Sequence, residues 1–218
     1  MNREPVRGAL WHGRVPRRIR RCGARFRRTG RWGPAKTNRG EERRAQVDVD
    51  LDARLRRIPD FPRPGILFID ITTLLKDPAA YREAVERVAA PLRDLGVERI
   101  VGPEARGFLL GAPVALALNV GFAPVRKCGK LPAARVCRRY ALEYGSDGLE
   151  LHRDAVEPGM RVGVVDDVLA SGGTARAAAE LVEELGGVVV LLSFLVELGA
   201  LRGREALGGR PAASVLVL

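Results

Sequence analysis

The sequence predicts an α/β fold in which a parallel sheet is flanked by helices. Short apolar runs of strand length alternate with longer amphipathic stretches over residues 77–196, which is typical of a parallel sheet covered on both faces. Hydrophobic residues make up 46% of the 218-residue chain, enough for a core of domain size. No apolar run approaches the roughly 18 residues that cross a bilayer, so we expect no membrane span.

The positive charge is concentrated at the N-terminus. Residues 1–44 hold 14 Arg and one Lys against three Glu, a net charge of +12, whereas residues 45–218 carry 22 basic and 23 acidic residues. We expect a basic disordered leader over residues 1–46 and one domain over residues 47–218. The leader could be an arm that binds nucleic acid, a solvated tail, or translated non-coding sequence. Because the domain itself is nearly neutral, nucleic acid is not its expected partner.

Local signals place the elements of this domain in order. Asp77 followed by proline favours a helix start, and apolar residues then recur at steps of three and four as far as Gly96. Pro91 is expected to bend this helix. Later apolar runs predict strands at 100–102, 122–125, 162–165 and 188–196, and helices at 109–118 and 174–185. Residues 128–148 lack periodicity and predict a long mobile loop that carries a short strand.

The cysteines indicate the compartment. Cys22, Cys128 and Cys137 form neither a CxxC pair nor a cluster with histidine. An odd and sparse set of this kind argues against a disulfide scaffold or a structural zinc site, and favours a reducing cytosol. We therefore expect a cytoplasmic protein.

The most informative segment is VGVVDDVLASGGT, residues 162–174. An apolar strand ends in two carboxylates, and a loop with two glycines and two hydroxyls leads into a helix. Ligands bind beyond the carboxyl ends of parallel strands, and a helix N-terminus suits phosphate. Paired acids suit sugar hydroxyls or a cation, although they could merely cap the helix. The candidate site comprises Asp166, Asp167, Ala170, Ser171, Gly172, Gly173 and Thr174.

This segment resembles the loop that binds phosphoribosyl pyrophosphate (PRPP) in type I phosphoribosyltransferases. Four further segments resemble the adenine phosphoribosyltransferases of that family, in the same order: IPDFPRPGILF at 58–68, EARGF at 104–108, RKCGKLP at 126–132 and YALEYG at 140–145. The resemblance runs from about residue 50 to the C-terminus. It implies a type I phosphoribosyltransferase fold with a small N-terminal hood, and the purine salvage reaction of adenine with PRPP to give AMP and pyrophosphate.

The resemblance also assigns chemical roles. Glu143 would assist the ring nitrogen of adenine as an acid–base group, with Tyr144 beside it covering the sugar, unless Glu143 is simply a solvated loop residue. Arg106 would bind the departing pyrophosphate from a turn after a strand. Further positive charge for PRPP would come from a basic segment that could otherwise be ordinary surface charge: Arg126, Lys127 and Lys130.

The base would pack on an apolar segment near the start of the domain, with backbone groups reading its edge. The candidates are Phe61, Ile66, Leu67, Phe68 and Ile69, although either phenylalanine could be plain core. Members of the family usually carry a basic residue at the position of Ile69. Either backbone contacts suffice for the base, or the base site is weakened or altered. We expect Ile69→Arg or Ile69→Lys to tighten adenine binding, unless neighbouring residues have repacked around Ile69, in which case a buried cation would cost stability.

The resemblance further implies Mg²⁺ held mainly by PRPP and pyrophosphate, with no metal-binding residue assigned, and a homodimer. Two other functions stay open: transfer to a different purine, and a PRPP-sensing regulator that binds nucleic acid. The segment with Glu143 and Tyr144 disfavours the regulator, since a regulator needs no acid–base group.

Overall fold

The computed structural model describes residues 49–142 and 145–218. The predicted leader over residues 1–46, together with Glu143 and Tyr144, lies outside the described residues, so the proposed domain boundary stays a prediction. Among the described residues, no helix is long and apolar enough to cross a membrane.

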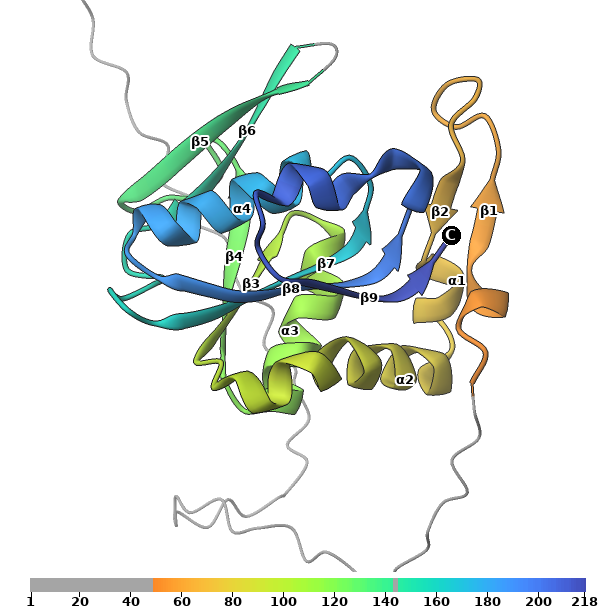
Figure 1. Ribbon diagram of the computed structural model, residues 1–218, viewed down its shortest axis with the longest axis horizontal. Coiled ribbons are helices and arrows are strands. Elements are labelled where there is room, and N and C mark those ends of the chain that lie inside the picture. Colours follow the sequence, from red (N-terminus) through yellow and green to blue (C-terminus); the bar gives the residue numbers. More distant parts are fainter. Residues whose placement is uncertain (1–48, 143–144) are drawn as a thin grey trace, which may run out of the picture. The chain divides into compact units, whose positions relative to one another are not determined.

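A seven-stranded sheet forms the centre of the domain (Figure 1). Its strand order is β5-β6-β4-β3-β7-β8-β9, in which β4, β3, β7, β8 and β9 pair in parallel and β6 pairs antiparallel with both β4 and β5. The strands are β3 (Arg99–Pro103), β4 (Gly121–Lys127), β5 (Arg135–Leu142), β6 (Gly145–His152), β7 (Arg161–Leu169), β8 (Val188–Glu197) and β9 (Ala212–Val217). The mostly parallel sheet of the prediction is confirmed.

Helices cover both faces of the sheet. Helix α4 (Gly173–Glu184) lies over one face, and α2 (Pro78–Ala89) and α3 (Arg106–Leu118) lie over the other (Figure 1). The core is divided accordingly, with one apolar cluster beneath α4 and a second between the sheet and the other two helices. The 3₁₀ segments η3 (Gly199–Leu201) and η4 (Gly203–Leu207) follow β8 and lead towards β9.

The predicted bend near Pro91 is a change of helix type. The side chain of Asp77 accepts the backbone N–H groups at the start of α2, as its N-cap position predicts. The α-helix ends at Ala89, and the 3₁₀ segment η2 (Ala90–Leu95) continues it to Gly96, which has a φ of 60°. Proline has no N–H to donate to the preceding turn, so regular α-helical bonding stops there.

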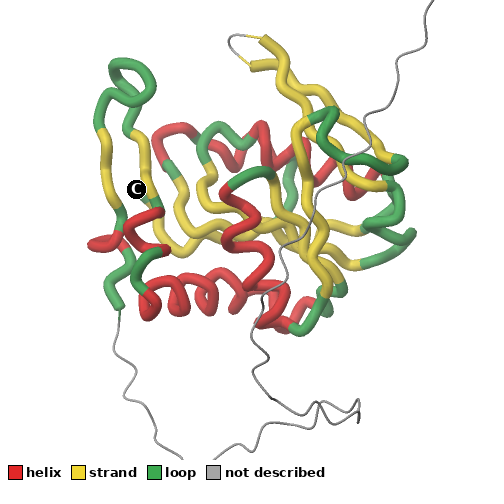
Figure 2. The backbone as a smooth tube through the Cα atoms, turned by 180° about the vertical axis from the view of Figure 1, so that it is seen from behind, coloured by secondary structure: helices red, strands yellow, loops and turns green. Residues whose placement is uncertain are grey.

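The prediction of a long loop over residues 128–148 is wrong. Strands β5 and β6 form an antiparallel hairpin whose register runs from Arg135 opposite His152 to Leu142 opposite Gly145. In Figure 2 this hairpin stands at one end of the sheet. Because β5 is an edge strand rich in arginine, its apolar alternation is too weak to be recognised in the sequence.

A disulfide bond joins Cys128 and Cys137, a pairing that the sparse set of cysteines did not predict. The two Cα atoms lie 6.4 Å apart. The hairpin fold brings the loop after β4 next to β5, and the number of cysteines carries no information about this proximity.

The hood is built from a two-stranded antiparallel sheet. Strands β1 (Arg56–Ile58) and β2 (Phe68–Asp70) pair, preceded by η1 (Asp52–Arg54) and followed by α1 (Thr72–Leu75). Figures 1 and 2 both place it at the end of the domain opposite the β5–β6 hairpin.

The structure corrects the role expected for the Ile69 side chain. Ile69 is only 3% exposed and belongs to the apolar cluster that also contains Leu51, Leu55 and Ile71. Its neighbour Phe68 is half-buried on the alternate face of the strand. A side chain in the core cannot hydrogen-bond a base, so the reason for expecting tighter adenine binding from a basic residue at position 69 is removed.

We predict that Ile69→Arg destabilises the protein instead of improving adenine binding. A guanidinium in this cluster would be buried without a partner, and should lower the free energy of unfolding by roughly 3 kcal/mol or more. The control Ile69→Val should cost only about 0.5–1.5 kcal/mol. Urea unfolding of the three proteins measures both effects. An arginine variant of unchanged stability that binds adenine more tightly would contradict this prediction.

Candidate active site

A cavity of about 230 Å³ opens at the carboxyl ends of β3 and β7. The turn after β3 contributes Glu104, Ala105 and Arg106. The other wall is formed by the end of β7, the following turn and the start of α4, residues 166–175. The structure thus brings together Arg106 and all seven residues that the sequence predicts in the segment 166–174.

The turn between β7 and α4 is shaped by glycine. Gly172 has a φ of 82°, which side-chain-bearing residues rarely adopt, and α4 begins at Gly173. A Cβ on Gly172 would lie 2.3 Å from the carbonyl oxygen of Gly203, so the turn packs directly against the backbone of η4. The first turn of a helix presents N–H groups and the positive end of its dipole. This end of the cavity therefore suits a phosphate.

The two aspartates of the cavity are almost fully buried. Asp166 is 8% exposed and Asp167 is 2% exposed. Burial, and next the neighbouring charge of Asp167, raise the pKa of Asp166 well above its ordinary value. Burial also raises the pKa of Asp167, against the opposing effect of Arg106. Hydroxyl donors or a cation arriving between these carboxyls would relieve their mutual repulsion.

Arg106 links this acidic pair to the hood. Its Nε atom lies 2.8 Å from Oδ2 of Asp167, and its guanidinium carbon lies 5.1 Å from the centre of the Phe68 ring. The rings of Phe68 and Phe61 meet edge to face at 5.2 Å. Phe61, Ile66 and Leu67 are 50%, 45% and 44% exposed, so they are not core residues. The hood therefore presents an apolar surface next to the cavity.

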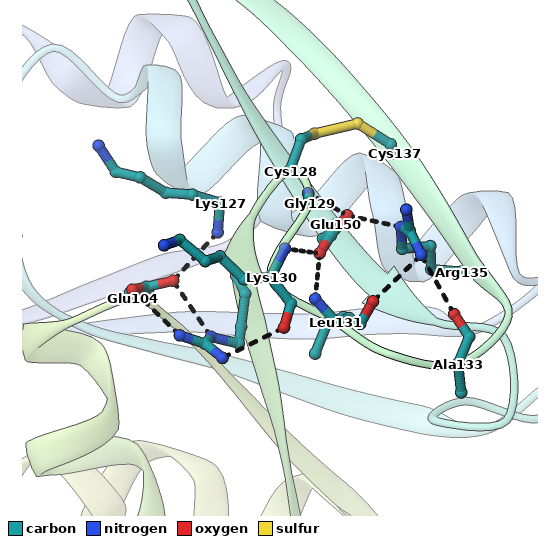
Figure 3. A network of polar contacts seen from close by, with 11 residues as sticks. Glu104, Lys127, Cys128, Gly129, Lys130, Leu131, Ala133, Arg135, Cys137 and Glu150 are labelled. Carbon is teal, nitrogen blue, oxygen red and sulfur yellow. Dashed lines mark hydrogen bonds and ion pairs between the residues drawn. A yellow bond between two sulfur atoms is a disulfide. The ribbon is translucent and has the colours of Figure 1, made fainter. Parts of the chain in front are cut away.

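The basic segment at the end of β4 is attached to the cavity through Glu104, a contact that the sequence did not reveal. Arg126 donates to both carboxylate oxygens of Glu104, at 3.2 and 3.3 Å, and the backbone N–H of Lys127 donates to the same carboxylate at 3.2 Å. The bonds from Arg126 lower the pKa of Glu104. Figure 3 shows the side chains of Lys127 and Lys130 extending to the side on which Glu104 lies.

Glu150 on β6 is a second residue that the sequence analysis missed. One carboxylate oxygen accepts the backbone N–H groups of Lys130 and Leu131, at 2.7 and 2.5 Å. The other accepts the N–H of Gly129 at 2.8 Å and lies 2.8 Å from Nε of Arg135 (Figure 3). Burial by itself raises the pKa of Glu150, but these backbone donors and Arg135 outweigh it and lower the pKa. Glu150 thereby holds residues 129–131 from within the domain.

The acid–base pair of the predicted site is not described by the structure. Glu143 and Tyr144 lie outside the described residues, between the end of β5 and the start of β6, so their roles stay predictions. Over residues 49–142 and 145–218, no group of three or more histidine, cysteine or acidic side chains is placed to hold a metal ion.

The phosphoribosyl transferase domain family matches residues 73–205. Curated adenine phosphoribosyltransferases of Alkaliphilus metalliredigens and Desulfitobacterium hafniense are 54% and 56% identical to the chain over 168 residues. These alignments cover 77% of this chain and 99% and 97% of the two relatives.

Solved structures of adenine phosphoribosyltransferases have the same fold. That of Thermoanaerobacter pseudethanolicus superposes with a TM-score of 0.75 at 51% identity, covering 77% of this chain and 98% of that one. The Saccharomyces cerevisiae enzyme, crystallised with adenine and an imino-altritol bisphosphate, gives 0.73 at 40% identity, with 76% and 96% covered. These identities over nearly the full length of the relatives show that the chain belongs to the phosphoribosyltransferase family, among its adenine phosphoribosyltransferases.

Proposed function

We propose that the chain transfers the phosphoribosyl group of PRPP to adenine, giving AMP and pyrophosphate in purine salvage. The observation that carries this proposal is the composition of a single cavity. It combines a buried pair of carboxyls, a turn with Ser171 and two glycines at a helix N-terminus, and Arg106. A ribose phosphate offers hydroxyls for the acids and a phosphate for the turn.

The ribose 5-phosphate is assigned to the turn and to the acidic pair. Hydroxyl and backbone donors of Ser171 and Thr174 would bind the phosphate oxygens, and Asp166 and Asp167 would accept the ribose hydroxyls. Both carboxyls have raised pKa values, because they are buried side by side. Hydroxyl donors stabilise their ionised forms, so PRPP binding favours deprotonation of the pair.

Pyrophosphate leaves the ribose as a polyanion, and the basic groups around the cavity stabilise the charge that develops on it. Arg106 lines the cavity directly, while Lys127 extends from the end of β4 and Lys130 from the loop that follows. Arg126 is engaged with Glu104, so its main contribution is to hold this loop against the turn after β3. The ribose carbon meanwhile becomes oxocarbenium-like, and the nearby aspartates stabilise positive charge there.

Adenine is assigned to the apolar surface of the hood. Phe68 and Phe61 offer a ring pair for the flat base, and Arg106 lies against the same Phe68 ring. Backbone groups would read the edge of the base, since the Ile69 side chain is buried in the core. Glu143 would accept the proton of the attacking ring nitrogen and Tyr144 would cover the sugar, as the family resemblance implies.

We further propose that Mg²⁺ enters with PRPP and that the enzyme is a cytoplasmic homodimer. The carboxylate oxygens of the cavity are ligands that Mg²⁺ accepts, and two acids leave most of its coordination to PRPP and water. When bound, Mg²⁺ neutralises part of the diphosphate charge and so favours its departure.

The direct test is turnover on a panel of free purines with PRPP and Mg²⁺. We expect adenine to be converted to AMP with one pyrophosphate released per AMP, and hypoxanthine and guanine to react far more slowly. Chromatography of the nucleotides and a coupled pyrophosphate assay measure both products. A preference for another purine would contradict the proposed acceptor, and release of pyrophosphate without any nucleotide would contradict the transfer.

We predict that the double variant Asp166→Asn, Asp167→Asn uses PRPP poorly. Amides replace two charged acceptors of ribose hydroxyls, and each such hydrogen bond contributes about 1.5–3 kcal/mol. The KM for PRPP should therefore rise by about tenfold or more, while the KM for adenine changes little. The matched control is Asp154→Asn in the exposed turn after β6, which should behave as wild type. An unchanged KM for PRPP with unchanged kcat would show that the acids do not face the ribose.

We predict that Glu150→Gln weakens PRPP binding through the loop that Glu150 holds. Both carboxylate oxygens accept hydrogen bonds, so glutamine must direct its NH₂ group at an N–H donor. The KM for PRPP should rise about tenfold, with the KM for adenine nearly unchanged. Glu98→Gln is the control, because Glu98 also accepts a backbone N–H, that of Arg161, away from the cavity. Equal changes in both Michaelis constants would indicate a general loss of structure instead.

The same variant should alter the acid sensitivity of the fold. The pKa of Glu150 is lowered from its ordinary 4.5 in the folded protein, so its ionised form contributes full stability above that value. This contribution is lost as the pH falls through the lowered pKa. Urea unfolding between pH 7 and pH 3 should therefore show a flatter decline for Glu150→Gln than for Glu98→Gln. Parallel declines would contradict the lowered pKa.

A further inference from the structure

The disulfide bond between Cys128 and Cys137 connects two parts of the sheet that are not hydrogen-bonded neighbours. Cys128 begins the loop after β4, and Cys137 lies within β5. Strand β6 runs between β4 and β5 in the sheet, so the bond crosses over β6. Figure 3 shows it above the same loop that Glu150 holds.

A glycine on β6 makes room for this bond. A Cβ added to Gly148 would lie 2.8 Å from Sγ of Cys128, closer than such atoms approach one another. The backbone N–H of Cys128 donates to the carbonyl oxygen of Gly148 at 3.0 Å, which fixes the height of the loop above the strand. The crossing therefore depends on three residues together: two cysteines and the glycine beneath them.

One cysteine of the bond is exposed, and cationic residues flank both cysteines in the sequence. Cys137 is exposed and Cys128 is half-buried. Arg138 and Arg139 follow Cys137 in the sequence, and Lys127 precedes Cys128. Neighbouring cations favour the thiolate, which is the form that attacks a disulfide.

The covalent ring closed by the bond contains the basic loop assigned to pyrophosphate. Lys130 lies within residues 128–137, and Lys127 directly precedes them. Glu150 anchors the backbone of this loop by hydrogen bonds, and the disulfide anchors its start to β5. Without the disulfide, the loop loses its covalent connection to β5 and is held by hydrogen bonds, among them those to Glu150 and the one from Cys128 to Gly148. PRPP must then order more of the loop on binding.

We propose that Cys128 and Cys137 form a reversible thiol–disulfide site that sets the affinity for PRPP, an inference that rests on the proposed function of the basic loop. A low-molecular-weight disulfide such as oxidised glutathione is the co-reactant. One cysteine thiolate attacks it and releases a glutathione thiol, and the second cysteine then displaces the other glutathione. Two cysteine thiols lose two electrons and two protons, which appear on two molecules of reduced glutathione.

The oxidised enzyme should bind PRPP more tightly than the reduced enzyme. Part of the ordering of the loop is already present in the oxidised form, so we expect a dissociation constant for PRPP roughly three- to tenfold lower. The KM for adenine should be the same in both forms, because the hood lies at the end of the domain opposite the β5–β6 hairpin.

The test uses the full chain with Cys22→Ser, which leaves Cys128 and Cys137 as its cysteines. The protein is equilibrated in glutathione buffers of different redox ratio and trapped with an alkylating reagent, and the linked peptide is measured by mass spectrometry. Calorimetry with PRPP and Mg²⁺ gives the dissociation constant in the fully oxidised and fully reduced forms. The variant Gly148→Ala should need a more oxidising buffer to form the disulfide. In a Cys128→Ser, Cys137→Ser background, Gly148→Ala should leave PRPP binding unchanged.

Several results would overturn the proposal. A disulfide that does not form at any glutathione ratio would remove the redox site. A disulfide that forms but leaves the dissociation constant for PRPP unchanged would remove its coupling to the loop. If Gly148→Ala changed PRPP binding as much in the Cys128→Ser, Cys137→Ser background as in the protein with both cysteines, the effect would come from β6 and not from the disulfide bond. Absence of PRPP binding in both forms would count against the proposed function as well. If both forms made AMP and bound PRPP with the same dissociation constant, only this inference would be contradicted.

Discussion

The parallel pairing of β3, β7 and β8 is the constraint on which the rest of the domain depends. Parallel strands need crossover connections, so helices cover both faces and the strands are buried from both sides. The shared direction of the parallel strands places their carboxyl ends at one edge, where the segments after β3 and β7 meet. Arg106 and Asp167, which are 61 residues apart in sequence, can therefore form an ion pair.

The part of the site that could be predicted from sequence is the part whose chemistry is local. Residues 166–174 carry strand, acids, turn and helix start in one continuous segment, so their spacing alone determines that they share one end of a strand. Glu104 and Glu150 act on segments about 20 residues away in sequence. The pattern Leu149-Glu150-Leu151 would be read as an ordinary strand with one solvent-facing charge, and only the position of the basic loop shows why Glu150 is buried.

The predictions for Ile69 and for the cysteines were wrong for related reasons. Comparison with a family pattern says which residue type is usual at a position, but not which face of a three-residue strand carries the side chain. The parity of a cysteine count is a property of the whole chain, whereas a bond needs two particular atoms to meet. That meeting requires the strand order β5-β6-β4 and the missing side chain of Gly148. The β5–β6 hairpin was not predicted because β5 is a basic edge strand. Without the hairpin, neither the strand order nor the position of Gly148 beneath the sulfur atoms could be predicted.

The close contact between Gly172 and Gly203 fixes one wall of the cavity, the turn between β7 and α4, whereas the hood and the basic loop are not held by it. Segment η4 behind the phosphate turn is itself pinned, because Arg204 donates twice to Glu197 at 2.7 and 2.8 Å and Ser214 donates to the same carboxylate at 2.7 Å. The turn is thus preorganised by folding, and a phosphate bound there, as we propose, would have little to rearrange. On the proposed function, changes in the hood or in the basic loop could then alter the choice of base or the affinity for PRPP without disturbing the turn assigned to the sugar phosphate.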